Sequence, residues 1–157
     1  MSANSARREI DGLAGFKQLA GQHVALSRWF DITQQRIDTF ADATEDHQWI
    51  HVDAGRSARE SPYGVTVAHG FLTLSLLPAM LGSALQMSGI RMAVNYGLNK
   101  VRFPAPVPVG SRLRARLDIV AVEDAQQGAQ VTWAVTIERE GHSKPVCVAE
   151  FLMRCHP

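Results

Sequence analysis

The sequence lacks a long uninterrupted apolar segment. Its most apolar stretch, residues 71–85, is interrupted by serines, a threonine, Pro78 and Gly82, and it is too short to cross a membrane. The first 12 residues also lack the apolar core that a secretory signal peptide needs. We therefore expect a cytoplasmic protein without a membrane partner.

The sequence also lacks an excess of either charge and has few cysteines. The 16 Lys and Arg residues and 15 Asp and Glu residues give a formal net charge of +1, so no basic surface for nucleic acid is predicted. The two cysteines, Cys147 and Cys155, match no CxxC or other metal-binding spacing. We expect both to be reduced thiols partly buried in a strand, where free cysteine is common.

The overall composition is that of an ordinary globular protein, with 46% hydrophobic and 20% charged residues. A chain of 157 residues is long enough for one domain with a sizeable core, and no internal repeat divides it. Residues 1–20 begin polar and basic, which predicts a loose N-terminal arm with a short helix near Phe16 to Leu19. Residues 21–157 are expected to form a single domain.

The first half of the domain alternates a strand pattern with helical patterns. Residues 23–32 have strand composition, and residues 33–44 have helical periodicity with Thr33 as the N-cap. Asp53 is placed to cap a short helix through Arg59, which the turn sequence SPYG ends.

A long, mostly buried helix is predicted over residues 69–87. Pro78 lies well inside this segment and should kink the helix or mark a break, because proline cannot donate the helical hydrogen bond.

The second half has the period-two alternation of a sheet with one solvated face. Residues 92–103 predict a strand, and three prolines then exclude residues 104–110 from a sheet interior. Apolar residues alternate with polar ones over 111–122, 131–140 and 145–155, which predicts an antiparallel meander. The long apolar helix is the obvious cover for its apolar face, so the expected class is α+β.

Acidic and histidine side chains gather around two apolar residues in the segment FADATEDHQWIHVD, residues 40–53. The segment VTVAHGF, residues 65–71, adds another histidine beside a glycine. Polar groups near an apolar site are unfavourable unless they are satisfied or used. This clustering therefore predicts a functional site next to Trp49 and Ile50.

The motif DHQWIHVD, followed by AHGFLTLSLL and NYGLNKVRFPAPVPVG, resembles MaoC-like dehydratases and (R)-specific enoyl-CoA hydratases, in particular their NodN-like branch. The resemblance extends from about Gly21 to the end of the chain. It implies the hot-dog fold, in which a curved antiparallel sheet wraps around a long central helix. It also implies hydration of trans-2-enoyl thioesters, or the reverse dehydration.

The same resemblance assigns roles to three residues. Asp46 and His51, separated by four residues, match the catalytic dyad, and Gly70 matches the glycine whose backbone N–H polarises the thioester carbonyl. Two departures from the common pattern, Glu45 in place of glycine and Gln48-Trp49 in place of Asn-Pro, concern the shape of the loop and the acyl chains that fit.

The chemistry of hydration agrees with these residue types. Two positioned acid–base groups can move the proton of an attacking water, and a fixed N–H donor can stabilise the developing enolate oxygen. We expect Trp49 and Phe71 to exclude water, and His69 and Asn95 to line the substrate site. His69 could equally serve only as a cap or a hydrogen-bonding residue.

The expected partner is an acyl-CoA or acyl-carrier-protein thioester, which is the substrate, and no cofactor is predicted. The expected assembly is a homodimer, because hot-dog domains usually pair edge to edge and an unpaired strand edge favours association.

Three other functions remain open from the sequence. His47, His51 and His69 are metal-ligand types, but no HExxH-like pair is present, and no metal site is predicted. A hot-dog thioesterase would share the fold and the substrate class but hydrolyse the C–S bond. A non-catalytic module that binds acyl thioesters is the third alternative, since a fold alone does not determine function.

Overall fold

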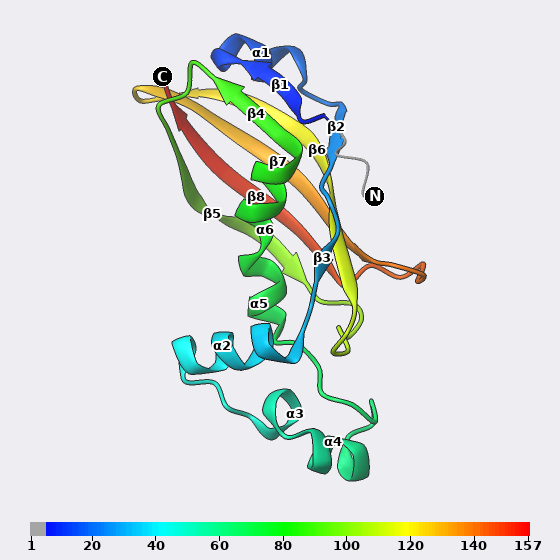
Figure 1. Cartoon of the computed structure of the whole chain (residues 1–157). Helices are drawn as coiled ribbons and strands as arrows, with labels where there is room; N and C mark the ends of the chain where they lie inside the picture. The colour runs from blue at the N-terminus through cyan, green and yellow to red at the C-terminus, as the bar shows by residue number, and fades with distance from the viewer. Residues whose placement is uncertain (1–5) are drawn as a thin grey trace.

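A curved antiparallel sheet packs along one side of two consecutive helices (Figure 1). The computed structural model describes residues 6–157. The elements in chain order are β1 (Arg8–Asp11), α1 (Gly12–Gln18), β2 (His23–Leu26), β3 (Phe30–Asp31), α2 (Gln34–Thr44), α3 (Trp49–Val52), α4 (Ala54–Glu60), α5 (Gly70–Ser75), α6 (Leu77–Ala84), β4 (Leu85–Ser88), β5 (Met92–Arg102), β6 (Arg112–Ala125), β7 (Gly128–Arg139) and β8 (Cys147–His156).

The main sheet has six strands in the order β2-β6-β7-β8-β5, and the short strand β3 also pairs with β6. All of these pairings are antiparallel. The predicted alternation is confirmed, because the buried residues on β6, β7 and β8 occupy every second position, apart from the additional buried Thr132 on β7. The predicted α+β class is therefore confirmed, and the core lies between the sheet and α5–α6.

Both cysteines lie on the buried face of β8. Cys147 and Cys155 are free and 0% exposed, and burial raises the pKa of each thiol to about 11. They therefore behave as small core residues in the protonated form.

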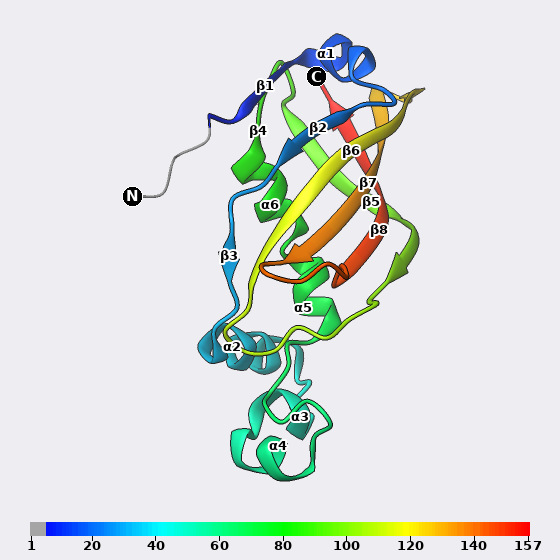
Figure 2. The same cartoon turned by 90° about the vertical axis from the view of Figure 1, so that its right-hand side faces the viewer.

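The predicted caps of the short helices are confirmed. The side chain of Thr33 accepts a hydrogen bond from the Arg36 amide at the start of α2, and Asp53 accepts one from the Arg56 amide at the start of α4. Helices α2, α3 and α4 lie at one end of the sheet, and α3 and α4 extend furthest from it (Figure 2). None of the helices within residues 6–157 is long and apolar enough to cross a bilayer.

The kink or break that Pro78 predicts within the helix of residues 69–87 is confirmed, but the predicted end of that helix is wrong. The helix breaks at Leu76, so that Pro78 lies in the first turn of α6, where a missing N–H does no harm. The second helix ends at Ala84, and residues 85–88 form β4, which pairs in parallel with β1.

The short helix predicted near Phe16 to Leu19 is present as α1, but the prediction that this N-terminal arm is loose is wrong for residues 8–18. Strand β1 pairs with β4, and Ile10 and Phe16 are 2% and 0% exposed in the core. The ring of Phe16 lies edge-on to that of Trp133 on β7, with 6.2 Å between centroids. Residues 1–5 of the predicted arm lie outside the described residues.

Candidate active site

Three chain segments bring acidic and histidine side chains together at the N-terminal end of α5. Glu45 ends α2 in a left-handed conformation with φ 62°, which turns the chain so that Asp46 begins the connection to α3. His51 lies on α3, and His69 is the N-cap residue of α5. One ligand-type atom each from Asp46, His51 and His69 lies within 4.8 Å of the other two.

His51 is held in one tautomer by the backbone. Its ring is buried, and Nδ1 lies 2.6 Å from the carbonyl oxygen of Val67. Because a carbonyl oxygen can only accept, Nδ1 carries the proton and Nε2 keeps a free lone pair. Burial lowers the pKa of His51 and is the largest effect, and the hydrogen bond to Val67 opposes it. The neighbouring His69 lowers the pKa and Asp46 raises it by smaller amounts. His51 is therefore set up as a neutral base.

Asp46 is exposed, and its side chain faces the same space. Its Oδ1 accepts a hydrogen bond of 3.3 Å from the Gln48 amide. Among residues 6–157 no direct hydrogen bond joins Asp46 to His51. Ligand-type atoms of the two residues lie within 4.8 Å of each other, a range that a single water bonded to both groups can bridge.

A glutamine that the sequence analysis missed fixes the position of His51. Gln34, the first residue of α2, donates a hydrogen bond of 2.8 Å from Nε2 to the carbonyl oxygen of His51. The hydroxyl of Thr66, which is 1% exposed, donates to Oε1 of Gln34 at 2.5 Å. A polar residue at the start of an amphipathic helix gives no sequence signal of this role.

Gly70 is the first residue of α5, and its backbone faces an aromatic ring. No acceptor among residues 6–157 takes up its N–H, which is one of the unpaired donors of a helix N-terminus. A Cβ at this position would lie 3.1 Å from the ring of Phe103, closer than ordinary contact. Phe71, which follows, is 70% exposed and lies edge-on to Phe103 at 6.5 Å between centroids.

The remaining predicted residues lie around this cluster. Trp49 is half-buried, and the guanidinium of Arg56 lies 4.3 Å from its ring centroid. Asn95 is exposed on β5. His47 points away from the cluster, since it pairs with Asp42 at 2.9 Å on the surface.

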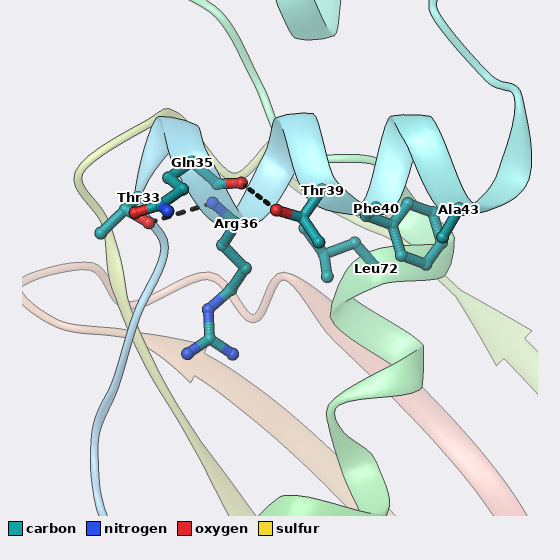
Figure 3. A pocket seen from close by; sticks show the side chains of 7 residues that line it. All are labelled: Thr33, Gln35, Arg36, Thr39, Phe40, Ala43 and Leu72. Carbon is teal, nitrogen blue, oxygen red and sulfur yellow. Dashed lines mark hydrogen bonds between the residues drawn. The ribbon is translucent and has the colours of Figure 1, made fainter.

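A cavity of about 480 Å³ lies next to the cluster, between α2 and α5 (Figure 3). Neither Asp46 nor His51 lines it. Phe40 separates the two spaces, because it lines the cavity and its ring lies 4.8 Å from that of His69. The lining residues are Thr33, Gln35, Arg36, Thr39, Phe40, Ala43 and Leu72.

The cluster has the residue types of a metal site but not a suitable geometry. The imidazole rings of His51 and His69 stack with 3.8 Å between centroids and 23° between planes. The lone pair of an imidazole nitrogen lies in the ring plane, and the two ring planes are stacked and nearly parallel, so the two lone pairs lie in separate planes. They do not converge on one ion at the roughly 2.0–2.1 Å that a zinc–imidazole bond requires.

The chain resembles known proteins along most of its length. Residues 15–140 match the MaoC like domain. The chain is 52% identical to 3-hydroxyacyl-thioester dehydratase Z from Mycobacterium tuberculosis over 94% of its own length and 97% of that protein. It is 47% identical to nodulation protein N from Rhizobium leguminosarum bv. viciae, over 89% of its own length and 88% of that protein.

A similar structure supports the fold. The unliganded R-hydratase from Pseudomonas aeruginosa superposes with a TM-score of 0.74 at 23% identity, covering 92% of this chain and 85% of that one. The hot-dog arrangement predicted from the sequence is thereby confirmed.

The environments of His51 and His47 shift the pKa values of the two side chains in opposite directions. We expect His51 to titrate below 6.5, because burial disfavours its charged form, and His47 to titrate above 6.5, because it donates to Asp42. Nε2 of His51 therefore stays unprotonated to a lower pH than an ordinary histidine would. NMR titration of the ring protons measures both values, and a midpoint for His51 at or above that of His47 would contradict this assignment.

Proposed function

This chain belongs to the MaoC-like family, and from that premise we propose that it is an (R)-specific enoyl-thioester hydratase that also catalyses the reverse 3-hydroxyacyl dehydration. The observation that carries the proposal is the arrangement of Asp46 and His51. A neutral imidazole with a free Nε2 lies beside a carboxylate, with ligand-type atoms of the two residues within 4.8 Å of each other. Water activation requires such a pair.

In this proposal the water is held between Asp46 and Nε2 of His51. Its oxygen bonds to the β-carbon of the enoyl thioester, and one of its protons passes to the dyad. The dyad returns a proton to the α-carbon, so that the elements of water are added across the double bond. Positioned acid–base catalysis of this kind contributes about 10²–10⁴-fold in rate.

We assign the unpaired N–H of Gly70 to the thioester oxygen. During attack, negative charge builds up on this oxygen as the enolate forms, and a fixed donor stabilises that charge more than it stabilises the ground-state carbonyl. The absence of a side chain at Gly70 makes room for the ring of Phe103, which lies 3.1 Å from the position of a Cβ. No metal or other cofactor takes part in this scheme.

The alternative activity, thioester hydrolysis, is less well supported. Hydrolysis requires water to attack the thioester carbon, whereas hydration requires it to attack the β-carbon. The relative with 52% identity is named a dehydratase of 3-hydroxyacyl thioesters, which favours hydration. The carrier of the acyl group is CoA or an acyl carrier protein, since both present the same thioester.

We further propose that two copies pair through β5. This strand is the edge of the sheet, and none of its residues is classed as buried within the single chain. Exposed apolar side chains on an edge strand promote unwanted association unless they are covered. If β5 of one copy pairs with β5 of a second copy, one symmetric contact covers this edge in both copies. On β5 these side chains are Met92, Val94, Tyr96 and Leu98, at 39–57% exposed.

The site adjoins this edge, which gives the dimer a functional consequence. Phe71 follows Gly70 directly and is 70% exposed in the single chain, so it cannot exclude water from the site by itself. A partner strand beside β5 would cover Phe71 and Phe103 and enclose the acyl thioester. Exclusion of water strengthens the electrostatic interactions on which the mechanism depends.

Substitution of the dyad tests the proposed function. We expect Asp46→Asn and His51→Ala each to lower kcat for enoyl-CoA hydration by about 10²–10⁴-fold while the protein still folds. Asp46→Asn should leave the melting temperature unchanged, whereas His51→Ala should lower it, because it removes the buried hydrogen bond to Val67. Because the two groups act on one water, the double variant should be little worse than the worse single variant. His47→Ala is the matched control and should keep its activity. Folded single variants with near wild-type turnover would refute the roles of the dyad.

Charge placed on β5 tests the dimer. We expect the wild-type protein to sediment at twice the mass of the 17.2 kDa chain, and Val94→Lys combined with Tyr96→Lys to sediment as a monomer with reduced turnover. Val120→Lys is the control, since Val120 is a 49% exposed apolar residue on β6. A fully active wild-type monomer at micromolar concentration would exclude the proposed assembly.

A further inference from the structure

His69 contacts both members of the dyad, although it lies 18 or more positions further along the chain. Its Nε2 lies 3.0 Å from the backbone carbonyl oxygen of Asp46. Its ring stacks on that of His51 at 3.8 Å between centroids. The other contact of the ring is with Phe40, at 4.8 Å. His69 is thus enclosed by the residues that it links, and it is only 3% exposed.

The hydrogen bond defines the state of the His69 ring. The carbonyl of Asp46 can only accept, so Nε2 of His69 donates and Nδ1 has the lone pair. Nδ1 is buried and has no partner among residues 6–157. One nitrogen of the ring is bonded to the backbone and the other is buried, so neither nitrogen is available to bind a substrate. This burial differs from the substrate-lining role expected from the sequence.

We propose that His69 is a positioning residue that fixes the positions of Asp46 and His51 relative to each other and to Gly70. The Nε2–H of His69 holds the backbone of the exposed Asp46 loop, and its ring face fixes the rotation of the His51 ring. Gly70 follows His69 directly, so the same residue also ties the proposed oxyanion donor to the dyad. This inference rests on the proposed hydratase function for its kinetic consequences, but not for its structural ones.

The two contacts of His69 can be removed separately. His69→Gln keeps an N–H donor at a similar reach but loses the ring, and His69→Phe keeps the ring but loses the donor. His69→Leu removes both at a similar volume. Because a displacement of about 1 Å can lower the rate by about 10²-fold, we expect His69→Leu to lose about 10²-fold in kcat. Its KM should change by less than about threefold, since the substrate does not touch His69.

The two conservative variants should each recover part of this loss. We expect His69→Gln and His69→Phe to be about tenfold more active than His69→Leu, because each keeps one of two positioning contacts. Thr73→Val is the matched control for disturbed packing in α5. Thr73 is 1% exposed, and its hydroxyl has no partner among the described residues, so this variant should match the wild-type kcat.

NMR of ¹⁵N-histidine-labelled protein supplies a readout that does not depend on turnover. We expect the wild-type spectrum to show the Nε2–H tautomer for His69 and upfield ring-proton shifts for His51, caused by stacking. The His51 shifts should persist in His69→Phe and disappear in His69→Leu. If these signals are as expected but the wild-type protein does not hydrate enoyl thioesters, the proposed function fails and the positioning role stands.

Three results would overturn the inference. The first is an Nδ1–H tautomer for His69 in the wild-type protein. The second is a folded His69→Leu variant with wild-type kcat. The third is an equal loss of kcat in the Gln, Phe and Leu variants, because a residue that acts through two contacts must be partly replaceable by one of them.

Discussion

The hydrogen bond from Nδ1 of His51 to the carbonyl of Val67 is the contact on which the proposed chemistry depends. It decides which nitrogen of the imidazole has the lone pair, and therefore where a proton can be taken up. It also joins α3 to the segment that precedes α5, so the base and the proposed oxyanion donor are fixed relative to each other. Without it the ring could rotate, and Nε2 would no longer face the water that Asp46 shares.

The rest of the fold supports this contact from both sides. Gln34 holds the carbonyl of His51 from α2, and Thr66 holds Gln34 from the segment next to Val67. The amide of Val67 in turn donates to the carbonyl of Ile50, at 3.0 Å, beside His51. The start of α5 is anchored in the core through Leu72, which is 5% exposed. The sheet thus supplies a rigid base for a site that is made almost entirely of loops and short helices.

The sequence predicts the local features of this structure well, because they depend on neighbouring residues. The caps at Thr33 and Asp53 and the alternation on β6, β7 and β8 are readable from short windows. The AHGF segment lies at the start of a helix, as predicted, whereas the short helix α3 that carries His51 was not predicted.

Features that depend on distant pairing were not predictable from such patterns. Strand β4 forms only because residues 85–88 pair with β1, which lies 77 positions earlier in the chain. The same pairing converts part of the expected arm into core. The partner of Nδ1 of His51 is a backbone carbonyl oxygen. Every residue has this group whatever its side chain, so no sequence signal marks Val67. The 70% exposure of Phe71 likewise depends on what the single chain leaves uncovered.

Incubation of the protein with trans-2-butenoyl-CoA and longer enoyl-CoAs tests the central claim most directly. The absorbance of the conjugated thioester, the release of free thiol and the configuration of the product would be followed together. Loss of absorbance without thiol release, giving the (R)-3-hydroxyacyl thioester, is the predicted result. Release of free CoA, formation of the (S) product, or binding without turnover would contradict the account.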